Sequence, residues 1–194
     1  VLQNKKLLDN FNYKMEDWKV AIRKYLLEEN KMKRRVLVTG ANGYVGRHVV
    51  KALLDKGCEV IASDFKFDGV DERAQRNTTP IFSDEENLYE KLGSPDVVVH
   101  LAWRNGFVHN ADTHITDLPN HYNFIKKMVD AKLPQLVVMG TMHEVGYWEG
   151  AINGDTPTNP TSMYGIAKNT LREAAYLLTK GSKTQLQWLR AYYI

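Results

Sequence analysis

The sequence is poor in several features that would point to particular classes of protein. It has a single cysteine, Cys58, so no disulfide can form within the chain, which suits a reducing, cytoplasmic environment. No apolar stretch approaches the roughly 20 residues of a membrane-spanning helix, so we expect no membrane partner. The net charge of +3 over 194 residues is too small to predict a nucleic-acid partner. What remains is the composition of an ordinary soluble protein with one sizeable core.

The first 33 residues differ in character from the rest. They are rich in Lys, Asn and Glu, and they lack the apolar run and the cleavage site of a signal peptide. Five apolar residues among them recur at helical spacing: Met15, Trp18, Ile22, Tyr25 and Leu26. This pattern predicts an amphipathic helix over roughly 14–30, which either packs on the main domain or a neighbouring chain, or binds a dedicated partner. We therefore expect an N-terminal helical extension, 1–33, and a main domain, 34–194.

In the main domain, short apolar segments alternate with segments of helical pattern. Strands are expected at 36–39, 59–62, 80–83, 96–101, 136–139 and 186–191. Helices are expected at 43–54, 84–92 with Asp84 as its cap, 117–131 and 162–180. Strands that are apolar throughout are buried on both faces, and alternation of strands with helices is typical of right-handed parallel α/β sheets. The pattern predicts a Rossmann-type, doubly wound parallel sheet with helices on both faces.

A glycine-rich turn follows the first expected strand. Gly40, Gly43 and Gly46 are spaced G-x-x-G-x-x-G between a strand and a helix. The first glycine permits a tight turn, the second lets a pyrophosphate approach the backbone, and the third lets the helix pack close to the strand. Free N–H groups and the positive end of the helix then favour phosphate, so the turn predicts a bound dinucleotide. Its other expected contacts are Asn42, Tyr44 and Val45.

The residue that closes the second strand bears on the choice of cofactor. Asp64 could bind both ribose hydroxyls and would repel a 2′-phosphate, which favours NAD over NADP. Lys66 lies nearby and could instead accept that phosphate, and Asp64 could simply begin a turn. We expect NAD, with Phe65 and Lys66 also close to the cofactor.

A tyrosine and a lysine lie four residues apart on the helix expected at 162–180. At this spacing the side chains of Tyr164 and Lys168 share one face. A free tyrosine has a pKa of about 10, too high for an effective base at neutral pH. A nearby ammonium favours the phenolate and lowers that pKa. The pair therefore predicts an acid/base group.

The same spacing occurs at Tyr122/Lys126 and Tyr176/Lys180, so the spacing alone does not identify the site. Tyr164 differs in its surroundings, because it follows helix-capping residues and a strand that ends at Thr141. Ligands of parallel sheets bind beyond the carboxyl ends of the strands. We therefore expect Tyr164 to belong to the site and the other two tyrosines to be packing or surface residues.

Together these motifs resemble the extended short-chain dehydrogenases/reductases, and in particular the NAD-dependent epimerase/dehydratase family that acts on nucleotide-diphospho-sugars. The resemblance rests on the turn 40–46, Asp64, the segment 96–102, Thr141 and the pair Tyr164/Lys168, and it covers 35–194. It implies that Tyr164 is the catalytic acid/base, that Lys168 lowers its pKa and binds the nicotinamide ribose, and that Thr141 hydrogen-bonds the substrate. Residues implied to line the cofactor are Leu101, Ala102 and Trp103. Residues implied to approach the substrate are Thr141, Met142, His143 and Tyr193.

The resemblance implies a sugar-nucleotide epimerase or reductase, with a homodimer as an expected assembly. Two alternatives remain: a dehydratase, and a scaffold that keeps the fold without catalysis. The dehydratases carry an Asp-Glu pair after the catalytic threonine, whereas here only Glu144 could serve, one residue out of register. An aspartate that often reaches the adenine is missing, with Ile81 nearest in register. Family members continue well beyond this length, so most of the substrate lobe lies outside the sequence.

Several histidines cluster in the middle of the chain without predicting a metal site. His109, His114 and His121 follow no single helix face and lack an accompanying acidic ligand pattern. His143 lies beside Thr141 and is either a substrate contact or a loop residue. The pair Tyr147-Trp148 either lines the sugar pocket or covers the core.

Overall fold

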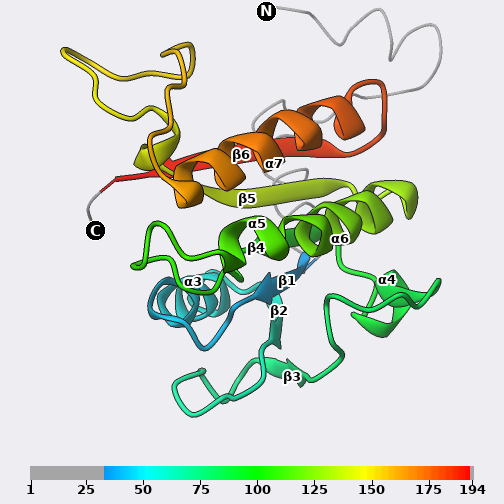
Figure 1. The fold of residues 1–194 in the computed structure, drawn as a ribbon. Helices are drawn as coiled ribbons and strands as arrows, with labels where there is room; N and C mark the ends of the chain where they lie inside the picture. The colour runs from blue at the N-terminus through cyan, green and yellow to red at the C-terminus, as the bar shows by residue number, and fades with distance from the viewer. Residues whose placement is uncertain (1–32, 193–194) are drawn as a thin grey trace, which may run out of the picture. The chain divides into compact units, whose positions relative to one another are not determined.

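The computed structural model describes residues 33–192, so the expected extension apart from its last residue, its helix and Tyr193 lie outside the described residues. Six parallel strands form one sheet in the order β3-β2-β1-β4-β5-β6 (Figure 1). The strands are β1 Arg35–Thr39, β2 Glu59–Ser63, β3 Gln75–Asn77, β4 Val97–His100, β5 Gln135–Thr141 and β6 Gln185–Ala191. The predicted Rossmann-type fold is confirmed.

Helices cover both faces of this sheet. They are α3 Tyr44–Asp55, α4 Leu88–Lys91, α5 Thr113–Thr116, α6 Leu118–Asp130 and α7 Met163–Thr179, with a 3₁₀ turn η1 at Met142–Glu144. Along β1 the side chains alternate: Leu37 packs in the cluster that contains Phe124 of α6, whereas Val38 packs in the cluster that contains Val50 of α3. The apolar strands are therefore buried from two sides, as their unbroken apolar pattern predicted. No helix of the described part is long and apolar enough to cross a membrane.

Two expected elements are wrong. The third strand is the polar segment 75–77 rather than 80–83, and the helix expected at 84–92 is reduced to Leu88–Lys91, with Asn87 rather than Asp84 at its N-cap. The true strand lies at the sheet edge and is mostly exposed, so it carries no apolar signal. The apolar residues Ile81 and Phe82 instead line a cavity.

Candidate functional site

The glycine turn at the end of β1 is close-packed backbone. Gly40 has a φ of +68°, and a Cβ there would lie 2.8 Å from the backbone nitrogen of Ala102. A Cβ on Gly46 would overlap the carbonyl oxygen of Gly40. Glycine is therefore required at both ends of the turn, for conformation at the first and for space at both. Gly43, at the N-cap of α3, is exposed.

Asp64 joins this turn to the end of β2. One carboxylate oxygen accepts the backbone N–H of Asn42 at 2.8 Å, and the other accepts the N–H of Phe65 at 2.7 Å. The Asn42 side chain in turn accepts the N–H of Gly69 at 2.9 Å. The carboxylate is thus fixed at the turn while remaining only half-buried.

A cavity of about 650 Å³ opens at this edge of the sheet. Eight of the predicted cofactor residues line it: Gly40, Asn42, Gly43, Asp64, Phe65, Leu101, Ala102 and Trp103. The other predicted cofactor residues are not part of its lining: Tyr44, Val45, Gly46, Lys66, Tyr164 and Lys168. Sequence reasoning missed six lining residues: Pro80, Ile81, Phe82, Arg104, Asp117 and His121. The one available signal is the apolar pair 81–82, which the sequence pattern assigns to a strand.

Thr141 and Tyr164 meet beyond the end of β5. Thr141 is the last residue of that strand, and its Oγ1 accepts the backbone N–H of His143 at 3.3 Å. Tyr164 follows the helix cap Ser162, and its own N–H donates to the carbonyl of His109 at 2.8 Å. Burial raises the pKa of Tyr164, and the neighbouring Thr141 side chain acts in the opposite direction.

Lys168 lies one turn further along α7 and is almost fully buried, with 3% of its surface exposed. Its Nζ donates to the carbonyl of Met139 at 2.7 Å and lies 4.0 Å from the ring centroid of Trp103. Burial lowers the pKa of Lys168 to about 7, although the charge of Glu144 acts in the opposite direction. The lowering of the Tyr164 pKa that we expect from Lys168 together with the positive nicotinamide ring stays a prediction.

Trp103 connects the cavity to this pair. Its ring lines the cavity and lies 6.1 Å from the ring of Tyr164, edge to face. Its indole N–H donates to Nδ1 of His114 at 3.0 Å, and its ring stacks on His121 with centroids 4.2 Å apart. The cofactor cavity and the Tyr164/Lys168 pair thus share one wall.

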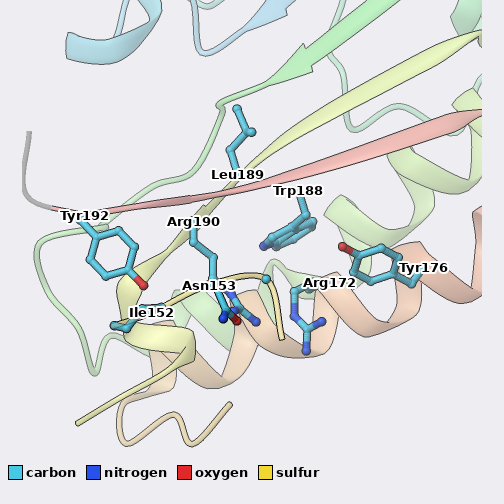
Figure 2. Close-up of a pocket in the computed structure, with 9 residues that line it drawn as sticks. Ile152, Asn153, Arg172, Tyr176, Trp188, Leu189, Arg190 and Tyr192 are labelled. Atoms are coloured by element: carbon cyan, nitrogen blue, oxygen red, sulfur yellow. The ribbon is translucent and has the colours of Figure 1, made fainter. Parts of the chain in front are cut away.

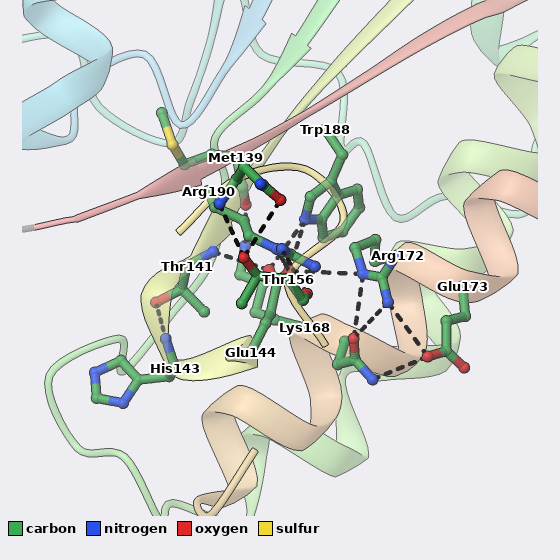
Figure 3. A network of polar contacts seen from close by, with 12 residues as sticks. Met139, Thr141, His143, Glu144, Thr156, Lys168, Arg172, Glu173, Trp188 and Arg190 are labelled. Atoms are coloured by element: carbon green, nitrogen blue, oxygen red, sulfur yellow. Dashed lines mark hydrogen bonds and ion pairs between the residues drawn. The ribbon is translucent and has the colours of Figure 1, made fainter. Parts of the chain in front are cut away.

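Glu144 is part of a buried polar network (Figure 3). Its carboxylate is fully buried and accepts the N–H of Thr141 at 2.9 Å, the indole N–H of Trp188 at 3.0 Å and Nε–H of Arg190 at 3.2 Å. Arg172 of α7 lies 3.7 Å from the same carboxylate. Both oxygens of Glu144 are engaged and neither reaches the surface, so the carboxylate is held within this network.

A second cavity, of about 350 Å³, lies between α7, β6 and the loop 152–154 (Figure 2). It is lined by Ile152, Asn153, Gly154, Arg172, Tyr176, Trp188, Leu189, Arg190 and Tyr192. None of the predicted cofactor or catalytic residues is among them. Tyr176 has its ring 5.7 Å from the guanidinium of Arg172, on the far part of α7.

The two rival Tyr/Lys pairs lack the setting of Tyr164. Tyr122 packs against the apolar core, and Lys126 forms an ion pair with Asp130. Tyr176 and Lys180 are exposed.

Three histidines lie beside the Tyr164 ring, and His114 is the nearest of them, with a centroid distance of 5.1 Å. The rings of His109 and His143 are 4.2 Å apart, and each lies about 6 Å from Tyr164, with centroid distances of 6.1 and 5.7 Å. Burial lowers the pKa of His143. Within 33–192, no group of three or more His, Cys, Asp or Glu side chains is placed to hold a metal ion.

A parallel sheet whose first strand ends in this glycine turn, with a carboxylate at the end of the second strand, defines a Rossmann-type dinucleotide-binding domain. The sequence model of the NAD dependent epimerase/dehydratase family matches residues 36–192, and the chain belongs to that family.

Known proteins of this kind are similar to the chain. It is 40% identical over 166 residues to dTDP-6-deoxy-L-talose 4-dehydrogenase (NAD(+)) of Aggregatibacter actinomycetemcomitans, which covers 82% of the chain and 61% of that relative. UDP-glucose 4-epimerase of Thermotoga maritima has the same fold, with a TM-score of 0.69 and 22% identity over 80% of the chain and 54% of that structure. The Thermus thermophilus UDP-glucose 4-epimerase complex with NAD has a TM-score of 0.67 and 21% identity over similar shares, 80% and 54%. The chain therefore spans between about half and three fifths of these relatives.

Proposed function

We propose that the protein containing this chain is an NAD-dependent oxidoreductase that interconverts a hydroxyl and a keto group on a nucleotide-diphospho-sugar. The observation that carries the proposal is the placement of Tyr164 beside Thr141 and the buried Lys168, across one tryptophan from a glycine-lined cavity. Its expected reaction is at carbon 4 of a dTDP-6-deoxy sugar, as in the name of the 40% identical relative.

The cavity suits NAD. The glycines let the backbone of the turn pack tightly, since a Cβ at Gly40 or Gly46 would collide with other backbone atoms. The free N–H groups at the start of α3 favour a pyrophosphate. Asp64 would bind the adenosine ribose hydroxyls and disfavour a 2′-phosphate. Bound NAD would accept or donate the hydride.

The remaining steps fall to the side chains. Tyr164 would accept the proton of the sugar hydroxyl during oxidation and return it during reduction. Thr141 would orient the same sugar oxygen. Lys168 would donate to the nicotinamide ribose. Because burial raises the pKa of Tyr164 within the protein, the phenolate would depend on positive charge near the ring when the cofactor is oxidised. Met142, His143 and Tyr193 would approach the sugar.

A dehydrogenase, an epimerase and a scaffold without catalysis differ in the products that they form. Incubation of the active protein with NAD and a panel of dTDP- and UDP-sugars separates them. A dehydrogenase yields stoichiometric NADH and a keto sugar, an epimerase yields an inverted sugar without net NADH, and a scaffold yields neither. The buried Glu144 argues against a standard dehydratase. Absence of any turnover with NAD bound would overturn the proposed function.

A further inference from the structure

Three buried histidines lie at or near the Trp103 ring. His114 and His121 contact the ring, and His100 is hydrogen-bonded to His121. His100 ends β4, His114 lies in α5 and His121 in α6, and each has 2% or less of its surface exposed. None belongs to a metal-binding group within the described residues. The proposed function above uses none of them.

His100 and His121 are the middle of a chain of hydrogen bonds. Thr39 Oγ1 lies 2.8 Å from Nδ1 of His100, and Nε2 of His100 lies 2.9 Å from Nδ1 of His121. At the start of this chain, the backbone N–H of Ala102 donates to Thr39 Oγ1 at 3.3 Å.

The hydrogen bonds that join Thr39, His100 and His121 have a preferred donor-to-acceptor direction. A threonine hydroxyl has one hydrogen, and among the described contacts the only acceptor for that of Thr39 is Nδ1 of His100. Neutral His100 then carries its hydrogen on Nε2 and donates it to Nδ1 of His121, which leaves the hydrogen of His121 on Nε2. The reverse direction would leave the buried Thr39 hydroxyl hydrogen without an acceptor, which is unfavourable.

Both imidazoles stay neutral at physiological pH. Burial lowers the pKa of His100 well below its usual value, and burial lowers that of His121 to about 3. The tautomers derived above therefore persist over the working range of the protein.

The last member of this series of hydrogen bonds, His121, faces the cofactor cavity. His121 is part of the cavity lining, and its Nε2 has no partner among the described residues. The one fully buried side-chain polar atom without a partner in the described part is Thr184 Oγ1, so His121 Nε2 is accessible from the cavity. His114 differs, because its Nδ1 accepts from Trp103 and its Nε2 lies 2.9 Å from the carbonyl of Val108.

We infer that Nε2–H of His121 donates a hydrogen bond to an acceptor oxygen of the bound dinucleotide, with Thr39 and His100 as positioning residues that fix its tautomer. This inference rests on the proposed binding of NAD. It assigns to α6 a cofactor contact beyond those of the glycine turn and α7.

Two substitutions at the same position test the contact. His121→Asn places an acceptor near the original Nδ1 and removes the cavity-facing donor, whereas His121→Gln places an amide N–H near the original Nε2. Calorimetric titration with NAD should show about three- to tenfold weaker binding for His121→Asn and near wild-type binding for His121→Gln. Equal affinity of wild type and both variants, or equal weakening in both, would overturn this inference alone. A wild-type protein that bound no dinucleotide would overturn the proposed function as well.

The positioning role has its own measurement. Long-range ¹H–¹⁵N spectra report which ring nitrogen of each histidine carries hydrogen. In the wild type we expect Nε2–H at both His100 and His121, and a loss of that preference in Thr39→Val, with rescue in Thr39→Ser. Nδ1–H at His121 in the wild type would contradict the derived direction, whatever the affinity for NAD.

Discussion

At the end of β1 the candidate site is made of backbone, whereas at the end of β5 it is made of side chains. In the first region, Gly40 and Gly46 allow chain segments to approach within distances that no Cβ permits. In the second, Thr141, Tyr164 and Lys168 project from a strand and a helix that would keep their conformation with other side chains. We therefore expect substitutions in the first region to damage folding and cofactor binding together. In the second region we expect substitution of Tyr164 to change the chemistry with little effect on folding, whereas the buried Lys168 also affects stability.

Tyr164→Phe should have the largest effect on activity. Loss of the hydroxyl removes the proposed acid/base, which typically contributes 10²–10⁴-fold to the rate, while the ring and its packing remain. Turnover should fall by about that factor, with NAD affinity and unfolding free energy nearly unchanged. Tyr122→Phe and Tyr176→Phe serve as matched controls and should do little. A Tyr176→Phe protein that folded but lost as much activity would show that the wrong pair was chosen.

Gly46→Ala should disrupt the packing of the glycine turn at the end of β1. The added Cβ would overlap the carbonyl oxygen of Gly40, so α3 and the turn must move apart. We expect a loss of about 3 kcal/mol in unfolding free energy, near the upper end for overpacking, and weaker NAD binding, measured by chemical denaturation and calorimetry. Gly106→Ala is the control, because nothing lies within 4 Å of a Cβ there. Equal unfolding free energies of Gly46→Ala and Gly106→Ala would show that the site at the end of β1 does not depend on close backbone packing.

Lys168→Met should change how stability depends on pH. Burial lowers the pKa of Lys168 from 10.5 to about 7, so between these values the unfolded chain binds more protons than the folded one. Stability of the wild type should rise with pH across this window, by at most about 1.4 kcal/mol per pH unit, and the cost of the buried charge is fully present below pH 7. Without added cofactor, the variant should lack this slope. Exposed Lys180→Met should retain it, and parallel curves for Lys168→Met and wild type would contradict the assignment.

The sequence allowed prediction of those parts of the fold and site that depend on local pattern. The glycine turn, Asp64 at the end of β2, and the choice of Tyr164 over two other tyrosines came from spacing next to an expected strand or helix. The edge strand β3 was missed because exposed, polar residues carry no burial signal. His121 was missed because it reaches the cavity from α6, far from the glycine turn in sequence, and Phe82 was missed because the apolar pair 81–82 reads as a strand. The roles of all these residues in binding and catalysis stay predictions.

The Glu144 network also limits which segments of this protein could be exchanged with those of a related protein in a chimera. The backbone N–H of Thr141 is held by a carboxylate that is itself held by Trp188 and Arg190, two residues of the strand that ends the described chain. A chimera that exchanged β6 with that of another family member would change what holds the proposed substrate-binding threonine. Successful crossover points should therefore keep 141–144 and β6 from the same parent, even though about 40 residues of intervening sequence separate them.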